Sequence, residues 1–257
     1  MMKEWLKPHR IILFLIAVGL VSAVVTQMRW DWLPRYYGEI LSGVWITLVI
    51  LFSTCILGIL LAVPLGLFQV TGPRPLALAC KSFCTLIRGT PLLLQLWLIY
   101  FGVGSLFPQL PWIRESFIWP FLREAWPYGV LALTASFAGY EGEIMRGAFA
   151  GVPPGELEAA RAYGMSRWTT LRRIWLPRAL HRALPTLAGE VVLQLKSTPL
   201  VATITVVDVY AVISKIRQET YIVYEPMLLL ALIYLCLTGC LVVGFTYLEN
   251  KIPTKGA

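Results

Sequence analysis

The sequence contains few charged residues and no group of residues with the pattern of a catalytic site. Only 14% of the 257 residues are charged, and the only two histidines are His9 and His181. No pair of carboxylates accompanies a nucleophile, which argues against a membrane enzyme. The P-loop sequence G-x-x-x-x-G-K-[ST], which holds ATP phosphates, is also absent. We therefore expect no catalysis and no cofactor in this chain.

The five cysteines lack the spacing of a metal or redox site. None of them forms a C-x-x-C pair, and most lie in or beside apolar runs. We interpret them as small, buried apolar residues rather than metal ligands. Long-period repeats and low-complexity segments are absent as well. The sequence thus gives no indication of a metal site or of a repeat architecture.

Hydrophobic residues, by contrast, dominate the composition. They make up 58% of the chain, and the mean hydropathy is +0.70. A soluble domain usually has about a quarter of its residues charged. The net charge of +8 would suit a nucleic-acid-binding protein, but in so apolar a chain it is more typical of basic cytoplasmic loops. We therefore expect membrane lipid, and not nucleic acid, as the surroundings of this chain.

Six apolar segments predict an all-α fold, a polytopic membrane helix bundle with about six transmembrane helices. They cover residues 11–27, 40–70, about 82–104, 127–150, 183–212 and 226–247. Segment 11–27 is either a retained helix or a signal peptide cleaved after Ala23, and we favour the retained helix because further spans follow. Segment 40–70 exceeds the roughly 20 residues needed to cross a membrane, so we expect it to tilt, kink or extend past the lipid. Residues 71–81 are expected to form a turn.

Basic residues lie mostly on one side of this predicted bundle. If both termini, residues 71–88 and residues 141–182 face the cytoplasm, that side has 15 basic residues and the opposite side has 6. The positive-inside rule then places the N-terminus and the C-terminus in the cytoplasm. Residues 105–126 are rich in aromatic residues and are expected to form a loop at the outer interface.

A long polar stretch, residues 151–182, interrupts the apolar sequence on the predicted cytoplasmic side. Pro154 suits the first position of a helix, and Glu156 falls in the first turn, where the helix dipole favours an anion. Gly164 is a helix stop signal, and Ser166 can cap a second helix. The sequence therefore predicts two short helices joined at Gly164, a shape suited to docking.

Seven residues of this stretch have the spacing of a known motif. They are Glu158, Ala159, Ala160, Gly164, Ile174, Leu176 and Pro177. The pattern resembles the EAA loop of ABC-importer permeases and matches it at each of these positions. The resemblance implies that the loop inserts as a coupling helix into a separate ATPase subunit, which would carry ATP and Mg²⁺. An ordinary amphipathic loop helix is the alternative, but it does not require a spaced pattern over about twenty residues.

Two further segments resemble one branch of this family. The segment LIRGTPLLLQLWLIYFG contains Arg88 and Thr90, and the segment YEGEIMRGAF contains Tyr140, Glu143 and Arg146. Both are similar to segments of the polar-amino-acid permeases, the histidine and glutamine type. The overall likeness is nearest to the M-type subunit of the histidine permeases.

The resemblance covers about residues 38–250 and implies one permease domain there. Residues 1–37 are then a cytoplasmic tail and an extra helix beyond the five-span pattern of the family, and residues 251–257 are a cytoplasmic tail. The implied partners are an ABC ATPase subunit, a second permease subunit, identical or homologous, and a periplasmic solute-binding protein. The implied location is a bacterial inner membrane. The implied cargo is a polar amino acid, and histidine, arginine, lysine, ornithine or an opine is the narrower expectation.

Polar and ionisable residues inside the predicted spans are candidates for a translocation path, because a charge that faces lipid is costly. These candidates are Arg88, Thr90, Tyr140, Glu143, Arg146, Glu190, Lys196 and Asp208. We expect Arg88, Glu143 and Arg146 to pair or to face a wet cavity. A purely structural salt bridge, or side chains that reach the lipid headgroups, is the alternative.

Two acidic residues in the fifth predicted span favour a cationic substrate. Glu190 and Asp208 are 18 residues apart, which places them on one face of an ideal helix unless Pro199 breaks it. With Lys196 as the one base, the span has a net negative charge. The alternative is that Lys196 pairs with a neighbouring helix and that Asp208 is a cap or a contact for the binding protein.

Three classes of function are compatible with a chain of this kind. The motif resemblances favour a permease subunit of an ATP-driven importer. A stand-alone secondary transporter or channel is the second class. Such a protein would be expected to contain inverted repeats or several charged groups along the spans. A membrane enzyme is the third and would require a catalytic cluster. Copurification with an ATPase distinguishes the first class from the other two.

Overall fold

The computed structural model describes positions 12, 15, 16, 19 and 22 and residues 28–251. The described part is mostly helical and contains no strand, which confirms the all-α helix bundle. Its helices are α3 (Leu33–Thr71), α4 (Arg74–Gly89), α5 (Leu92–Trp97), η1 (Leu98–Val103), η2 (Gly104–Gln109), α6 (Pro111–Arg114), α7 (Trp119–Leu122), α8 (Trp126–Ala150), α9 (Pro154–Ala162), α10 (Arg167–Thr170), η3 (Leu171–Trp175), α11 (Leu176–Ser197), η4 (Thr198–Ile204), α12 (Val209–Thr220) and α13 (Tyr224–Lys251). The predicted helix 11–27 and both tails lie largely outside the described residues, so they stay predictions.

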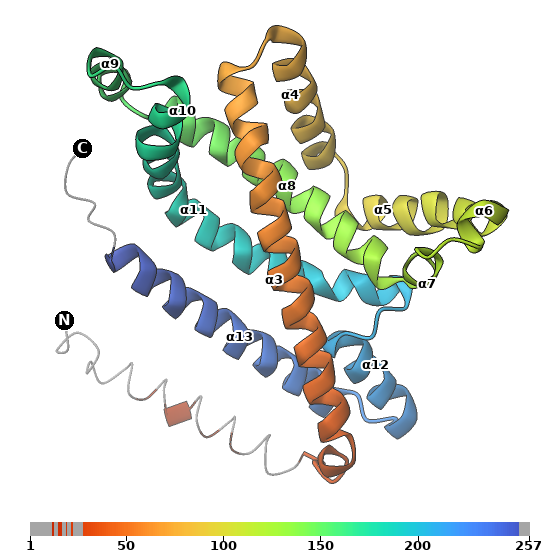
Figure 1. The fold of residues 1–257 in the computed structure, drawn as a ribbon. Helices are drawn as coiled ribbons and strands as arrows, with labels where there is room; N and C mark the ends of the chain where they lie inside the picture. Colours follow the sequence, from red (N-terminus) through yellow and green to blue (C-terminus); the bar gives the residue numbers. More distant parts are fainter. Residues whose placement is uncertain (1–11, 13–14, 17–18, 20–21, 23–27, 252–257) are drawn as a thin grey trace.

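Helices α3 and α8 pack against each other at the centre of the bundle (Figure 1). A Cβ atom at Gly58 would lie 2.5 Å from Cδ1 of Phe137, and one at Gly66 would lie 2.6 Å from Cβ of Met145. Two glycines eight residues apart on α3 therefore admit two large side chains eight residues apart on α8. This close approach makes α8 the buried centre of the fold, with α4 and α11 also packed against it.

Most of the segment predicted as a turn is a helix instead. The chain turns at Gly72 and Pro73, and α4 already begins at Arg74, so the turn predicted for residues 71–81 is wrong beyond Pro73. Pro73 and Arg74-Pro75 supply the start signal, because proline is favoured in the first turn of a helix. Helix α4 then runs back alongside α3 and α8 (Figure 1).

The predicted third span, residues 82–104, is broken near its middle. Thr90 has an extended backbone (φ −118°, ψ 143°), because a residue that precedes proline is disfavoured in a helix. Gln95 connects the two pieces, since its Nε2 donates to the carbonyl of Ile87 at 2.7 Å and to Thr90 Oγ1 at 2.8 Å. The apolar run therefore changes direction between α4 and α5.

Three helical stretches among the described residues are long and apolar enough to cross a membrane. They are α3, Leu92–Gln109 and Tyr224–Glu249, and the bent pair Arg167–Ile204 and Val209–Thr220 would add a fourth. Helix α3 has 39 residues, or about 58 Å at 1.5 Å per residue, so it exceeds a simple crossing as expected. Helix α8 matches the predicted span 127–150 but is enclosed by other helices. The number of six crossings remains a prediction.

The predicted fifth span, residues 183–212, consists of two helices at an angle. Helix α11 ends at Ser197, the turn η4 follows, and Thr205 has a left-handed backbone (φ +70°) before α12 begins. Glu190 and Asp208 therefore do not share a face of one helix, which is the outcome expected if Pro199 breaks the span. Pro199, the residue named as a possible break, lies inside η4.

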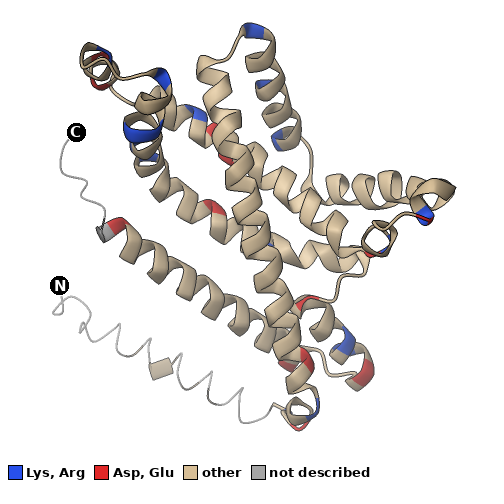
Figure 2. Ribbon diagram, in the orientation of Figure 1, with Lys and Arg blue, Asp and Glu red and all other residues tan. Residues whose placement is uncertain are grey.

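Charged residues differ between the two ends of the bundle. Lys and Arg of α4, α10 and the start of α11 lie toward the end that holds α9, together with fewer acidic residues on α8 and α9, whereas the two signs are more evenly mixed around α12 (Figure 2). This distribution places the basic loops of the sequence together in space.

Candidate functional site

The predicted helix pair lies at one end of the bundle, where α9 projects beyond its neighbours (Figure 1). After α9, Gly164 has a left-handed backbone with φ +72°. Its N–H donates to the carbonyl of Arg161 at 2.9 Å, and the N–H of Met165 donates to that of Ala160 at 3.0 Å. These two bonds form a Schellman motif, in which glycine is favoured because it has no Cβ. The predicted stop at Gly164 is confirmed.

The second helix of the pair begins as predicted but does not end as predicted. Ser166 Oγ accepts a hydrogen bond from the N–H of Thr169 at 3.2 Å, as an N-cap residue does. Helix α10 then continues through the π-helical η3 into α11, so the prediction of a second short helix is wrong. Pro177 stands at the start of α11, where the π turn before it already breaks the regular hydrogen-bond pattern.

The motif residues of α9 face in two directions. Glu158 and Ala159 are exposed, whereas Ala160 is buried. Two aromatic side chains at the joint, Tyr163 and Trp168, expose 84% and 68% of their surfaces. Large aromatic residues exposed beside small residues are typical of a protein interaction surface.

The motif residues beyond Gly164 connect α9 with α11. Ile174 and Pro177 line a hollow of about 540 Å³ together with Ala159. Leu176 packs on the buried cluster that contains Phe149. A salt bridge joins two residues of its lining, since Arg178 Nε lies 2.9 Å from Glu156 Oε2. These contacts connect α9 with α11. The sequence alone did not point to Arg178, because its pairing depends on the fold.

The candidates of α4 and α8 form two separate contacts. Arg146 Nε donates to Glu143 Oε1 at 2.6 Å within α8. The guanidinium of Arg88 instead lies over the ring of Tyr140, 5.6 Å from its centroid, a cation–π contact. The expected pairing is thus found for Glu143 and Arg146, but Arg88 contacts Tyr140 rather than Glu143. Thr90 Oγ1 donates to the carbonyl of Leu86 at 2.9 Å at the break of the span.

Exchanging the two charges of the Glu143–Arg146 pair is expected to restore the uptake that each single change reduces. Glu143→Arg or Arg146→Glu places like charges three residues apart on α8, which is unfavourable. The double variant restores opposite charges at the same spacing. Uptake is measured at matched membrane abundance. A double variant that folds but stays inactive would show that the two residues line the path rather than stabilise α8.

The three candidates of the fifth predicted span have different surroundings. Glu190 is half-buried on α11 and has no hydrogen bond or ion pair with another described residue. Arg88 lies near enough for the two charges to interact. Lys196 is exposed near the end of α11, and Asp208 is buried and accepts the N–H of Ala211 at 2.9 Å. Asp208 is thus the N-cap of α12, as the structural alternative expects.

The structure adds two buried polar residues that the sequence did not single out. Glu141 on α8 is fully buried, and neither carboxylate oxygen has a hydrogen-bond partner among the described residues. Gln194 on α11 donates to Thr54 Oγ1 at 3.0 Å and to the carbonyl of Leu133 at 3.2 Å. Gln194 therefore ties α11 to α3 and α8. The sequence feature that could have identified Glu141 is the position of this acidic residue inside a predicted span.

The cysteines follow the expectation only in part. Cys80 and Cys84 are buried, and Cys55 is half-buried, as small apolar residues would be. Cys236 and Cys240 are exposed on α13, so burial is wrong for these two. They lie four residues apart on a helix that is apolar along its length, which allows thiols on its outer face.

Known proteins resemble this chain in sequence and in fold. The family model described as binding-protein-dependent transport system inner membrane component matches residues 54–253. The octopine transport system permease protein OccM of Rhizobium radiobacter is 40% identical over 210 residues, which are 82% of this chain and 84% of that protein. The histidine/lysine/arginine/ornithine transport system permease protein HisM of Salmonella typhimurium is 36% identical over 228 residues, 88% of this chain and 95% of that protein.

Chains of solved ABC transporter structures also share the fold of this chain. A chain in the crystal structure of an amino acid ABC transporter with histidines superposes with a TM-score of 0.73 at 29% identity, covering 88% of this chain and 99% of that chain. A chain of the inward-facing MetNI methionine ABC transporter shares the fold, with a TM-score of 0.65 at 17% identity over 84% of this chain and 97% of that chain. The chain belongs to the family of binding-protein-dependent transport system inner membrane components and is a permease subunit of an ABC transporter.

Proposed function

We propose that this permease takes up a basic amino acid or an opine from the periplasm, driven by ATP hydrolysis in a partner subunit. The observation that carries the proposal is the projecting joint of α9, Gly164 and α10, with Glu158 and Ala159 exposed on it. The names of two relatives, which refer to octopine and to histidine, lysine, arginine and ornithine, support the substrate class.

The proposed complex contains this chain and three partners. An ABC ATPase subunit with ATP and Mg²⁺ binds the α9 end, a second permease subunit packs beside this one, and a periplasmic solute-binding protein delivers the substrate at the opposite end. We place the complex in a bacterial inner membrane with both termini of this chain in the cytoplasm. The concentration of basic residues near α9 supports this orientation (Figure 2).

The proposed coupling route runs from α9 to the interior of the bundle. The ATPase moves α9, and the Glu156–Arg178 salt bridge and the hollow beside Ala159 transmit the movement to α11. Helix α11 carries Glu190, which we assign to the translocation path together with Arg88 and Tyr140. A half-buried carboxylate without an ion pair suits a cationic substrate.

Copurification tests the proposed complex. A tagged copy of this chain, solubilised from its native membrane in mild detergent, is expected to retain an ABC ATPase and a second permease chain in stoichiometric amounts. Mass spectrometry of the purified material identifies the subunits. If the chain purifies alone and still transports its substrate after reconstitution, it is a stand-alone transporter and the proposal is wrong.

A further inference from the structure

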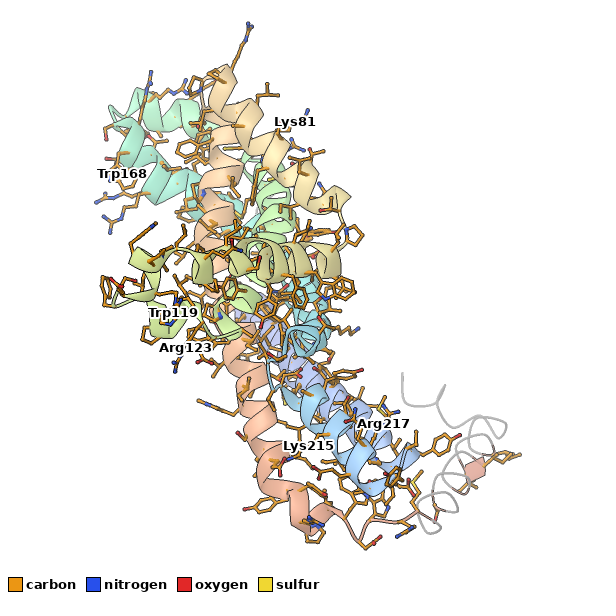
Figure 3. The ribbon with its side chains drawn as sticks, turned by 90° about the vertical axis from the view of Figure 1, so that its right-hand side faces the viewer. Lys81, Trp119, Arg123, Trp168, Lys215 and Arg217 are labelled. Atoms are coloured by element: carbon orange, nitrogen blue, oxygen red, sulfur yellow. The ribbon has the colours of Figure 1, made fainter. Side chains whose placement is uncertain are left out.

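A polar hollow of about 550 Å³ lies beside α12, at the end of the bundle opposite α9. Two basic residues of its lining, Lys215 and Arg217, lie on α12 (Figure 3). The other residues of the lining are Ala202, Thr203, Tyr210, Ala211, Ser214, Gln218 and Val223. This volume is within the range of small-molecule sites, and the lining contains no carboxylate.

Three acidic residues on or near α12 already have partners. Glu39 Oε2 accepts from Lys215 Nζ at 2.8 Å, and Glu219 Oε2 accepts from the hydroxyl of Tyr36 at 2.8 Å. Glu225 Oε1 accepts the backbone N–H of Arg29 at 3.0 Å. The charge of Lys215 is therefore compensated, and none of these carboxylates forms an ion pair with Arg217.

Arg217 is the uncompensated cation of the hollow. Within the described part of the chain it pairs with no carboxylate, its Nε is buried without a hydrogen-bond partner, and its one hydrogen bond goes from Nη1 to the thioether of Met227 at 3.7 Å. Tyr210, Ser214 and Gln218 make no side-chain hydrogen bond with another described residue. An anion bound here would satisfy the buried Nε of Arg217, and the three polar side chains beside it could donate further hydrogen bonds to that anion.

We propose that this hollow binds a small molecule through its carboxylate, with Arg217 as the anchor and Tyr210, Ser214 and Gln218 as further hydrogen-bonding groups. A guanidinium binds a carboxylate through two parallel hydrogen bonds, which few other pairs provide. The lack of acidic lining residues disfavours binding of an ammonium group here. The choice of a carboxylate among anions rests on the proposed function, since amino acids and opines carry this group. The hollow is thus a subsite separate from Glu190.

Chemical protection of Arg217 tests this site directly. The complete transporter is reconstituted without its solute-binding protein and treated with phenylglyoxal, which modifies arginine side chains, and the modification of each arginine is followed by peptide mass spectrometry. The two probes are arginine and agmatine, which has the same guanidinium but no carboxylate. At ten times its Kd, arginine is expected to slow modification of Arg217 about tenfold, because only empty sites react. Agmatine is expected to leave the rate unchanged, and Arg114 is the internal reference.

Matched variants show which side chains of the hollow hold the carboxylate. Lys215→Gln is expected to keep the protection, because Lys215 is already paired with Glu39. The double change Ser214→Ala with Gln218→Ala is expected to raise the half-protecting concentration of arginine about 30-fold, since each of the two lost hydrogen bonds contributes about 1 kcal/mol. Glu190→Gln is expected to keep the protection, so the site can be confirmed even if the proposed path through Glu190 fails.

Three results would overturn the inference. Equal protection by arginine and agmatine would show that the carboxylate is not recognised. No protection by arginine would show that the hollow does not bind it. If protection requires the solute-binding protein, with or without a ligand, then Arg217 contacts a carboxylate on the surface of that protein instead.

Discussion

Replacing Gly164 with aspartate is expected to abolish uptake and solute-stimulated ATP hydrolysis while the protein stays in the membrane. The backbone at Gly164 is left-handed, with φ +72°, a conformation that glycine adopts more readily than any residue with a side chain. A negative charge at the C-terminal end of α9 is also unfavourable for the helix dipole. Together these effects change the direction in which α9 meets its partner. Uptake and ATPase activity of the reconstituted complex measure the result.

Two further variants test how much of this loss is caused by the negative charge at the joint. Gly164→Asn has the same size as the aspartate but is neutral and tolerates a left-handed backbone, so it is expected to retain more activity. Gly38→Ala is the distant control, because a Cβ there meets no atom within 4 Å. Normal uptake by a well-expressed Gly164→Asp variant would remove the coupling role of the joint.

Replacing Glu190 with glutamine is expected to reduce arginine uptake and to spare glutamine uptake. A hydrogen bond to a charged group contributes about 1.5–3 kcal/mol, so loss of the carboxylate lowers kcat/KM for arginine by roughly 10- to 100-fold. Glutamine has no positive charge on its side chain and does not need this partner. Initial uptake rates of both amino acids are compared at matched membrane abundance.

Asp208→Asn is the matched control for this experiment. Asp208 caps α12, and asparagine is also a good N-cap residue, so this variant is expected to affect both substrates equally and only slightly. Selective loss of arginine uptake in Asp208→Asn would show that it contacts substrate. If Glu190→Gln leaves uptake of both amino acids unchanged, Glu190 does not select the substrate, and selectivity belongs to the solute-binding protein.

Signals that act over a few residues explain what the sequence predicted correctly. The joint between α9 and α10 depends on Pro154 at a helix start, Gly164 at a helix stop and Ser166 as a cap, and each acts within one turn. The apolar run 127–150 likewise predicted α8 to within one residue at its start. These elements do not need information from the rest of the fold.

Breaks inside apolar runs were harder to predict, because hydropathy does not record how a backbone is hydrogen-bonded. The chain breaks before Pro91 and around Pro199, but Pro64 and Pro185 lie inside continuous helices. Proline alone therefore does not locate a break. Tertiary packing decides, as the bridge from Gln95 to Thr90 shows at the first of these breaks.

Contacts between distant residues were the least predictable part of the candidate sites. Arg178 pairs with Glu156 across 22 positions, and Glu39 with Lys215 across 176. Because the second pairing compensates the charge of Lys215, Arg217 is left as the uncompensated cation of the hollow. Glu141 is buried because α8 is enclosed by three helices, a fact that no local pattern contains.

Uptake into proteoliposomes tests the central claim, that this permease moves its substrate only when a partner ATPase hydrolyses ATP. The reconstituted complex is supplied with the solute-binding protein and labelled arginine outside and with ATP and Mg²⁺ at the α9 side, and a parallel sample carries an ATPase whose P-loop lysine is replaced. We expect uptake in the first sample and none in the second. Uptake at equal rates in both samples, or in the absence of ATP, would contradict the claim.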